Sequence, residues 1–109
     1  MPGSSDLARG NINLQMLLGI TLSPASVANA TSAEQTFSVP GLLVGDFVGI
    51  QKPTAQAGLG IVGNRVSAAN VLAVTFMNTT SATITPTASE VYTVKVLRAS
   101  NTTLPVSIQ

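Results

Sequence analysis

The chain has 109 residues, of which nine are charged and 45% are hydrophobic. This length allows a single domain. The absence of His and Cys excludes imidazole and thiolate metal sites, Ser-His and Cys nucleophiles, and disulfides. The carboxylates are Asp6, Glu34, Asp46 and Glu90, and no two of them lie close together in the sequence. We therefore expect a protein that is not an enzyme and that binds no metal or cofactor.

Charge and hydropathy also argue against nucleic-acid and membrane binding. Five basic residues and a net charge of +1 provide no basic stripe that could neutralise a run of phosphates. The N-terminus has no basic segment of the signal-peptide kind, and the apolar stretch at 12–22 is interrupted by Asn, Gln, Gly and Thr. That stretch is also shorter than the roughly 20 apolar residues that span a bilayer. We expect neither nucleic acid nor membrane as a partner.

Residues 12–22 carry the clearest periodicity in the chain. Every even position is apolar, whereas Asn13, Gln15, Gly19 and Thr21 occupy odd positions. This period of two is typical of a β-strand, and a helix would spread the apolar residues around its axis. At roughly 3.3 Å per residue the segment would extend about 36 Å, about twice the length of a usual strand. Two interpretations remain open, a long first strand that bends at Gly19 or an arm that lies on a neighbouring subunit.

Short apolar runs separated by turn residues follow along the chain. After a Ser-, Ala- and Thr-rich connection, strands are expected at 35–39, around a bend at Gly45-Asp46 within 42–50, and at 59–66, with a loop at 52–58. Residues 59–66 are apolar on both faces, which suits a central strand.

Two further strands are expected at 71–77 and 91–98, separated by a Thr-rich connection at 78–89. In the last strand Tyr92, Val94 and Val96 are expected to point inward, and the tail again alternates at Leu104, Val106 and Ile108. Seven or eight strands of this kind predict an all-β protein, an antiparallel β-sandwich of jelly-roll or immunoglobulin-like type. Residues 1–33 would form an extended N-terminal arm and connection, and 34–109 the sandwich domain.

Two local patterns have chemical interpretations that we do not favour. GLGIVG at 58–63 matches the dinucleotide-binding pattern, but it follows a Pro-containing loop and precedes a strand-like run rather than a helix. We expect these glycines to permit a bulge or a close backbone approach. Three N-x-S/T sequons also occur, at Asn29, Asn78 and Asn101, and chance explains them in a chain this rich in Ser and Thr.

The remaining candidates are charges and aromatic rings beside apolar runs. Asp46 and Arg65 could form a structural ion pair, or each could be a solvated surface charge. The four aromatic residues lie in predicted strands, where core packing is the first interpretation and a sugar-stacking platform the second. They are Phe37, Phe47, Phe76 and Tyr92.

Three segments resemble small structural proteins of tailed bacteriophages, and above all head-decoration, or cement, proteins. The segments are VGDFV at 44–48, GLGIVGNRVSAAN at 58–70 and VTFMNTT at 74–80. The resemblance covers roughly residues 34–98. It implies a β-sandwich bound to the outside of a capsid, and it carries no catalytic residue. Segment 12–22 lies outside it, so its role is inferred from periodicity alone.

The expected function is therefore that of a structural virion protein, made in the host cytoplasm and located on the capsid exterior. It would stabilise the capsid by bridging subunits of the major capsid protein, and it would act as a homo-oligomer, a dimer or a trimer. The alternative is a carbohydrate- or receptor-binding β-module of a phage tail or fibre. The residues expected to contact the capsid or a sister subunit are the even-numbered apolar ones of the first strand, Ile12, Leu14, Met16, Leu18, Ile20 and Leu22.

Overall fold

The computed structural model describes residues 10–100 and 103–107. In this part of the chain there are six strands and no helix, so no helix there could cross a membrane. All strand pairs are antiparallel. The strands are β1 (Ile12–Leu22), β2 (Thr31–Ser38), β3 (Phe47–Gln51), β4 (Leu59–Ala68), β5 (Val71–Asn78) and β6 (Glu90–Ala99).

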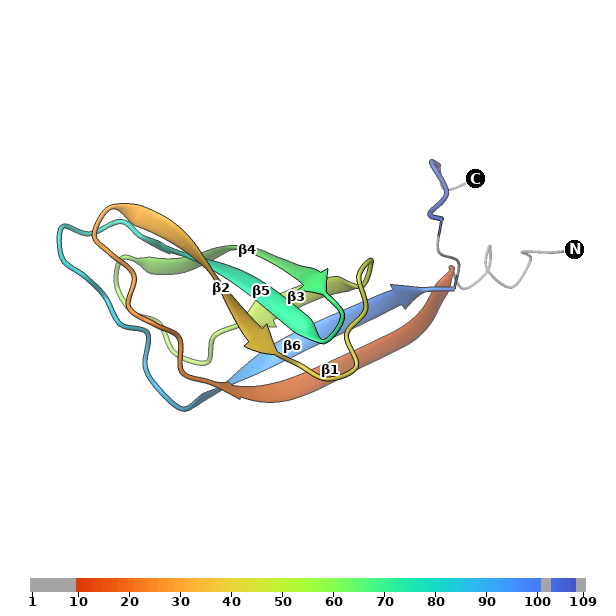
Figure 1. Ribbon diagram of the computed structural model, residues 1–109, viewed down its shortest axis with the longest axis horizontal. Coiled ribbons are helices and arrows are strands. Elements are labelled where there is room, and N and C mark those ends of the chain that lie inside the picture. The colour runs from red at the N-terminus through yellow and green to blue at the C-terminus, as the bar shows by residue number, and fades with distance from the viewer. Residues whose placement is uncertain (1–9, 101–102, 108–109) are drawn as a thin grey trace, which may run out of the picture.

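The strands form two three-stranded sheets that face each other (Figure 1). The first sheet has the order β1-β6-β3 and the second the order β2-β5-β4. The prediction of an all-β protein is confirmed, and the arrangement is consistent with a β-sandwich. The jelly-roll and immunoglobulin-like types, which have eight and seven or more strands, are not confirmed.

The core lies between the two central strands, β5 and β6. Alternate residues of each strand point to the same face, and in β6 Tyr92 and Val94 are completely buried, as the pattern predicts. In β5 the apolar side chains that face the other sheet are Leu72, Val74 and Phe76, all completely buried. Burial of such side chains contributes about 1.5–3 kcal/mol each, so these two inner faces hold the sheets together.

Strand β1 belongs to this sandwich. Its bounds coincide with the expected segment 12–22, and residues 14–22 pair with β6 without interruption. An extended N-terminal arm is therefore not confirmed, because the long first strand completes the chain's own sheet. Residues 1–9, the beginning of the expected arm, lie outside the described residues.

Strand β4 differs from its prediction, because it lies at an edge of the second sheet and not at its centre. Its pairing with β5 shifts between Ile61 and Gly63, so Val62 is extra at that point and 58% exposed. A bulge thus explains why apolar residues occur on both faces, and it agrees with the expected role of the glycines.

Two other expected strands do not form among the described residues. Residues 42–44 lie in a turn before β3, and residues 104–107 are irregular, while Ile108 lies outside the described part. In the turn, the backbone N–H of Asp46 donates to the carbonyl of Leu43 (3.0 Å). An apolar run alone does not distinguish such a turn from a short strand.

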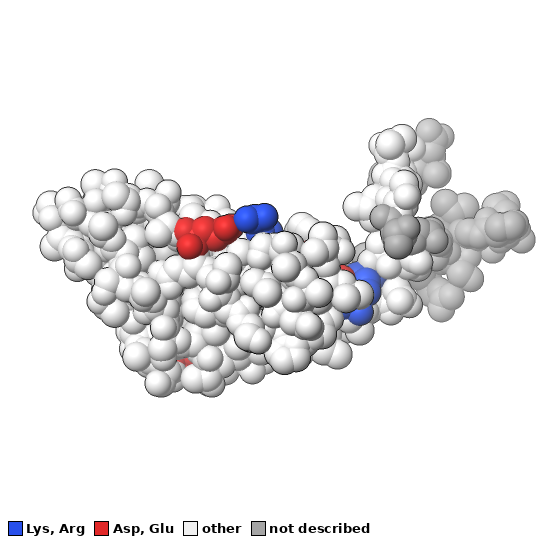
Figure 2. All heavy atoms as spheres, in the orientation of Figure 1, with Lys and Arg blue, Asp and Glu red and all other residues white. Residues whose placement is uncertain are grey.

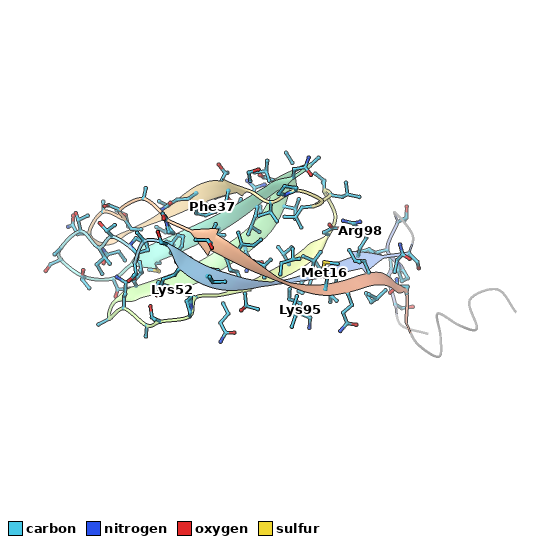
Figure 3. All side chains as sticks on the ribbon, turned by 90° about the horizontal axis from the view of Figure 1, so that it is seen from below. Met16, Phe37, Lys52, Lys95 and Arg98 are labelled. Carbon is cyan, nitrogen blue, oxygen red and sulfur yellow. The ribbon has the colours of Figure 1, made fainter. Side chains whose placement is uncertain are left out.

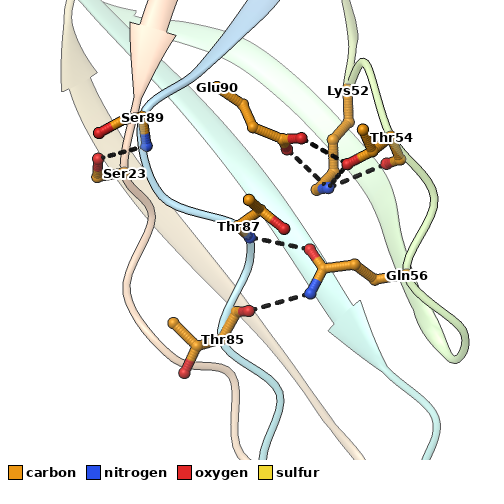
Figure 4. A network of polar contacts seen from close by, with 8 residues as sticks. All are labelled: Ser23, Lys52, Thr54, Gln56, Thr85, Thr87, Ser89 and Glu90. Carbon is orange, nitrogen blue, oxygen red and sulfur yellow. Dashed lines mark hydrogen bonds and ion pairs between the residues drawn. The ribbon is translucent and has the colours of Figure 1, made fainter.

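Polar side chains hold the long connections at one end of the sandwich. The buried Asn78 donates from Nδ2 to the carbonyls of Val27 (3.0 Å) and Ala82 (2.8 Å). It thereby links the connection that precedes β2 to the connection that follows β5. Figure 4 shows a second network, in which Gln56 binds the backbone of Thr85 and Thr87. Paired amides of this kind stabilise one loop conformation, and leaving the buried Asn78 unpaired would be costly.

Nearby, Lys52 Nζ lies 2.9 Å from Glu90 Oε1 (Figure 4). The Glu90 carboxylate also accepts a hydrogen bond from the Thr54 hydroxyl. These contacts hold the pKa of the Glu90 carboxyl below its usual value, the Thr54 hydrogen bond being the larger cause. Lys52 also donates to the Thr54 carbonyl (2.9 Å). The network therefore fastens the 52–58 loop to the start of β6.

Candidate interaction surface

The structure uses most of the six predicted contact residues inside the chain itself. Leu22 is buried, and Leu14, Leu18 and Ile20 pack against the core. Figure 1 shows that β1 and β6 extend beyond the second sheet at the end where β1 begins and β6 ends. Ile12 and Met16 are accordingly 46% and 44% exposed, so of the predicted set these two remain the most accessible.

The more exposed apolar surface lies on the opposite face of the first sheet. The register places Gln15, Leu97 and Phe47 in one row across the sheet, and Leu17, Lys95 and Gly49 in the next row. Leu17 is 70% and Phe47 69% exposed, and Leu97 lies between them, partly buried. We call Leu17, Leu97 and Phe47 the outer-face patch.

Two features shape the patch. Lys95 lies directly opposite Leu17, in the row next to that of Leu97 and Phe47. Figure 3 shows Lys95 on the outer side of the sheet, while Met16 lies on the inner side. Beyond Lys95 in that row is Gly49, whose missing side chain leaves open space beside Phe47. The patch is therefore a shallow apolar area with one cation beside it, a composition typical of protein interaction surfaces.

The outer face of the second sheet has a different composition. Its rows combine Ser32 with Met77, Glu34 with Thr75, and Thr36 with Ala73 and Arg65. The Arg65 guanidinium donates to both carboxylate oxygens of Glu34 (2.9 Å each) across the intervening strand. On the molecular face seen in Figure 2, the acidic and basic atoms gather in a few small places and the rest is uncharged.

Of the two interpretations of Asp46 and Arg65, the mutual ion pair does not form, because Arg65 binds Glu34 and Asp46 binds Arg98. Arg98 donates from Nε to Asp46 Oδ1 (2.8 Å) and from Nη2 to Oδ2 (2.7 Å), and the Asp46 side chain is only 2% exposed. Arg98 also donates to the carbonyl of Gly41 (2.8 Å), and Asp46 accepts from the Leu43 N–H (3.0 Å). This pair fixes the 41–46 turn that leads into Phe47.

These contacts set the ionisation of the acidic groups. The Arg98 hydrogen bonds hold the pKa of the Asp46 carboxyl below its usual value, against the opposing effect of burial. The Arg65 hydrogen bonds likewise lower the pKa of Glu34. Burial, and then the charge of Glu90, raises the pKa of the Tyr92 hydroxyl.

The three described carboxylates each bind a different cation. Glu34 binds Arg65, Asp46 binds Arg98 and Glu90 binds Lys52, while Asp6 lies outside the described residues. Among the described residues, no three His, Cys, Asp or Glu side chains come together in a way that could hold a metal ion. The paired carboxylates are thus structural contacts of separate loops and strands.

A hollow of about 250 Å³ opens beside the 41–46 turn. It is lined by the exposed side chains of Leu43, Val44 and Leu104 and by the ion pair of Asp46 with Arg98. This hollow adds apolar surface near the end of the sandwich where β3 begins.

The aromatic residues are distributed unevenly between core and surface. Phe76 and Tyr92 are completely buried, and Phe37 is partly buried against the core. Phe47 alone of the four is largely exposed. One exposed ring makes a poor platform for stacking a sugar chain, but it is a suitable anchor for a protein interface.

The outer-face patch was not predicted from the sequence, although one signal for it was present. Leu17 is the single apolar residue at an odd position among polar ones and glycine in segment 12–22. Such an exception to the alternation indicates an apolar side chain on the solvent face of a strand.

No family model, curated protein or solved structure matches this chain.

Proposed function

We propose that this protein is a structural component of a bacteriophage virion, where it binds the outside of the capsid and stabilises it by bridging subunits of the major capsid protein. It is made in the host cytoplasm and acts as a homo-oligomer on the capsid exterior. The observation that carries the proposal is the outer-face patch, with Leu17 and Phe47 exposed on a β-sheet that carries one cation there. The resemblance of segments 44–48, 58–70 and 74–80 to head-decoration proteins supports the same function.

The chemistry of the patch suits a stabilising contact between subunits. Apolar surface contributes roughly 25 cal/mol for each Å² removed from water, and specific interfaces bury about 1,200–2,000 Å² in total. Burying Leu17 and Phe47 costs no charge desolvation, whereas an unpaired buried charge would be expensive. Contacts made to two capsid subunits at once would raise the free energy needed to separate them.

Lys95 gives the proposed contact a polar rim. A charge at the rim adds little affinity but rejects surfaces of the same sign and orients the approaching partner. We therefore expect the capsid surface beneath the protein to be apolar at its centre, with an acceptor or a carboxylate opposite Lys95.

The alternative, a carbohydrate- or receptor-binding module of a tail or fibre, is supported only by the exposed ring of Phe47. Sugar recognition uses several polar groups converging around an aromatic surface. Around Phe47 the register places Leu97 and, in the next row, Gly49 and Lys95. This composition favours a protein surface over a glycan as the ligand.

Co-sedimentation with empty heads tests the proposal, using particles that lack the protein. Wild-type protein should sediment with the heads and raise the temperature at which they open. Phe47→Ser should weaken binding at least tenfold, or about 1.4 kcal/mol, because the anchor of the patch is lost. Val62→Ser is the matched control, since Val62 is 58% exposed but belongs to the second sheet.

Equal binding by Phe47→Ser and Val62→Ser would exclude the patch as the contact. Failure of the wild-type protein to bind heads, together with its absence from purified particles, would contradict the function as a whole. Specific capture of a glycan by the wild-type protein, lost in Phe47→Ser, would favour the alternative.

A further inference from the structure

The two described sheets present four edge strands, and three of them carry features that prevent pairing with another strand. Strand β4 contains two register irregularities and Arg65, and β2 carries the exposed charge of Glu34. Strand β3 has only five residues and is followed directly by Lys52-Pro53. Bulges, charges, prolines and short length are the devices by which edge strands avoid association.

Strand β1 has none of these protections along 14–22. It contains no charge and no proline, and its register with β6 is continuous over this stretch. Within the described residues, the backbone of 14–21 hydrogen-bonds only to β6. On an antiparallel edge every second residue points its N–H and C=O away from the sheet. A row of backbone donors and acceptors is therefore free to pair with another strand.

The side chains of β1 are complementary to a second copy of the same strand. In an antiparallel pairing centred on Leu17, residues equidistant from Leu17 lie opposite each other. Asn13 then faces Thr21, and Gln15 faces Gly19. On the inner face every pair is apolar: Ile12 with Leu22, Leu14 with Ile20, and Met16 with Leu18.

We propose that two copies of this chain associate through β1, antiparallel and in a register centred on Leu17, to form one continuous six-stranded sheet β3-β6-β1-β1-β6-β3. The interface is isologous, with the same strand contributed by both copies about a two-fold axis. Leu17, which is 70% exposed in the single chain, packs against Leu17 of the second copy. The pairing thereby covers the most exposed apolar residue of β1.

The charges near β1 permit this pairing. Lys95 lies opposite Leu17 on β6, so the two copies of Lys95 are separated by three strand spacings, or about 14 Å at 4.8 Å each. That separation exceeds the Debye length of about 8 Å at physiological ionic strength. Arg98, opposite Leu14, is already neutralised by Asp46.

The dimer deepens the proposed function, on which its biological use rests. Residues directly opposite in an antiparallel pair point to the same face, so the two outer-face patches lie on the same side of the joined sheet. Once one patch of the dimer has bound the capsid, the second patch is held close to the capsid surface. Its contact is then effectively intramolecular, which strengthens binding overall. This arrangement would let one dimer bridge two capsid subunits.

Crosslinking tests the interface, because the chain has no native Cys. In the proposed register the Cα atoms of the two copies of Leu17 lie about 4.5–5.5 Å apart, within the range of a disulfide. Leu17→Cys should therefore form a covalent dimer rapidly in oxidised glutathione. Thr21→Cys is the matched control, because Thr21 is exposed on the same face of the same strand but would lie opposite Asn13.

Sedimentation equilibrium tests the association without a crosslink. Wild-type protein should show a species of twice the monomer mass of 11.1 kDa, and Leu17→Lys should weaken the dimer at least tenfold by placing two like charges together. Val44→Lys, at a position with the same 70% exposure outside β1, should leave the dimer intact. Circular dichroism establishes that both variants remain folded.

A wild-type monomer at every concentration would overturn the proposal, as would equal crosslinking by Leu17→Cys and Thr21→Cys. These results are separable from those on the capsid. Head binding that persists in a monomeric protein overturns the dimer alone, whereas a dimer that fails to bind heads overturns the proposed function alone.

Discussion

The two outer faces of the sandwich are built from the same kind of strand but present different surfaces. The first sheet exposes Leu17 and Phe47 around Leu97. The second carries Ser, Thr and Gly beside the exposed side chains of Met77 and Val62, with Glu34 and Arg65 paired across Ala73. With only nine charges in the chain, the main polar difference between the faces is the Glu34–Arg65 pair on the second and the single Lys95 on the first.

The two arginine pairs differ in the same way. The pair of Asp46 with Arg98 is shielded, with side-chain exposures of 2% and 27%, and it also holds the turn before Phe47. The pair of Glu34 with Arg65 is exposed, at 37% and 63%. A shielded pair supports the fold of the apolar face, whereas an exposed pair mainly keeps its own face polar.

The largest expected effect separates these two pairs. Asp46→Ala should lower the free energy of unfolding by about 2–3 kcal/mol, because Arg98 and the Leu43 N–H lose their acceptor. The melting temperature should fall by roughly 10 °C. Glu34→Ala, the matched change on the second sheet, should shift it by no more than about 3 °C, since exposed pairs contribute little. Equal shifts in thermal unfolding would remove the distinction between the pairs.

A second change tests whether Lys95 limits the apolar face. Lys95→Leu would join new apolar surface to Leu17 and Leu97, and the solubility of the protein should fall severalfold. Thr36→Leu adds apolar surface to the outer face of the second sheet, where Arg65 keeps its charge, and should have a smaller effect. Precipitation by polyethylene glycol measures both. If Thr36→Leu is the less soluble variant, the apolar character of the first face is overstated.

The smallest expected effect is the response to acid. Because the Arg98 hydrogen bonds lower the pKa of Asp46 from its ordinary 3.8, its contribution to stability is complete above that value and is lost as the pH falls through the lower pKa of the folded state. The melting temperature should therefore decline on going to about pH 3. Asp46→Asn should flatten that decline, and Glu34→Gln should change it less. An unchanged slope in Asp46→Asn would mean that other groups control acid unfolding.

Much of the strand content could be predicted because it depends on local periodicity. The alternation of segment 12–22 predicts the bounds of β1, and that of 91–98 predicts the buried positions Tyr92, Val94 and Val96. Successive side chains of a strand point to opposite faces wherever the strand lies in the fold. The exposure of Leu17 could also be inferred, because this residue breaks the alternation of segment 12–22. For Phe47 the sequence predicts a core position, and only its place on the sheet shows that the ring is exposed.

The pairing of strands and charges was decided by the tertiary structure. Strand β1 pairs with β6, whose paired residues are 68 to 87 positions away, and β4 lies at an edge despite its apolar sequence. Arg65 faces Glu34 rather than Asp46 because β5 brings β2 and β4 to its two sides. Alternation along a chain determines which side chains share a face. Which strand becomes a neighbour, and hence which face stays exposed, depends on how two sheets close over one core.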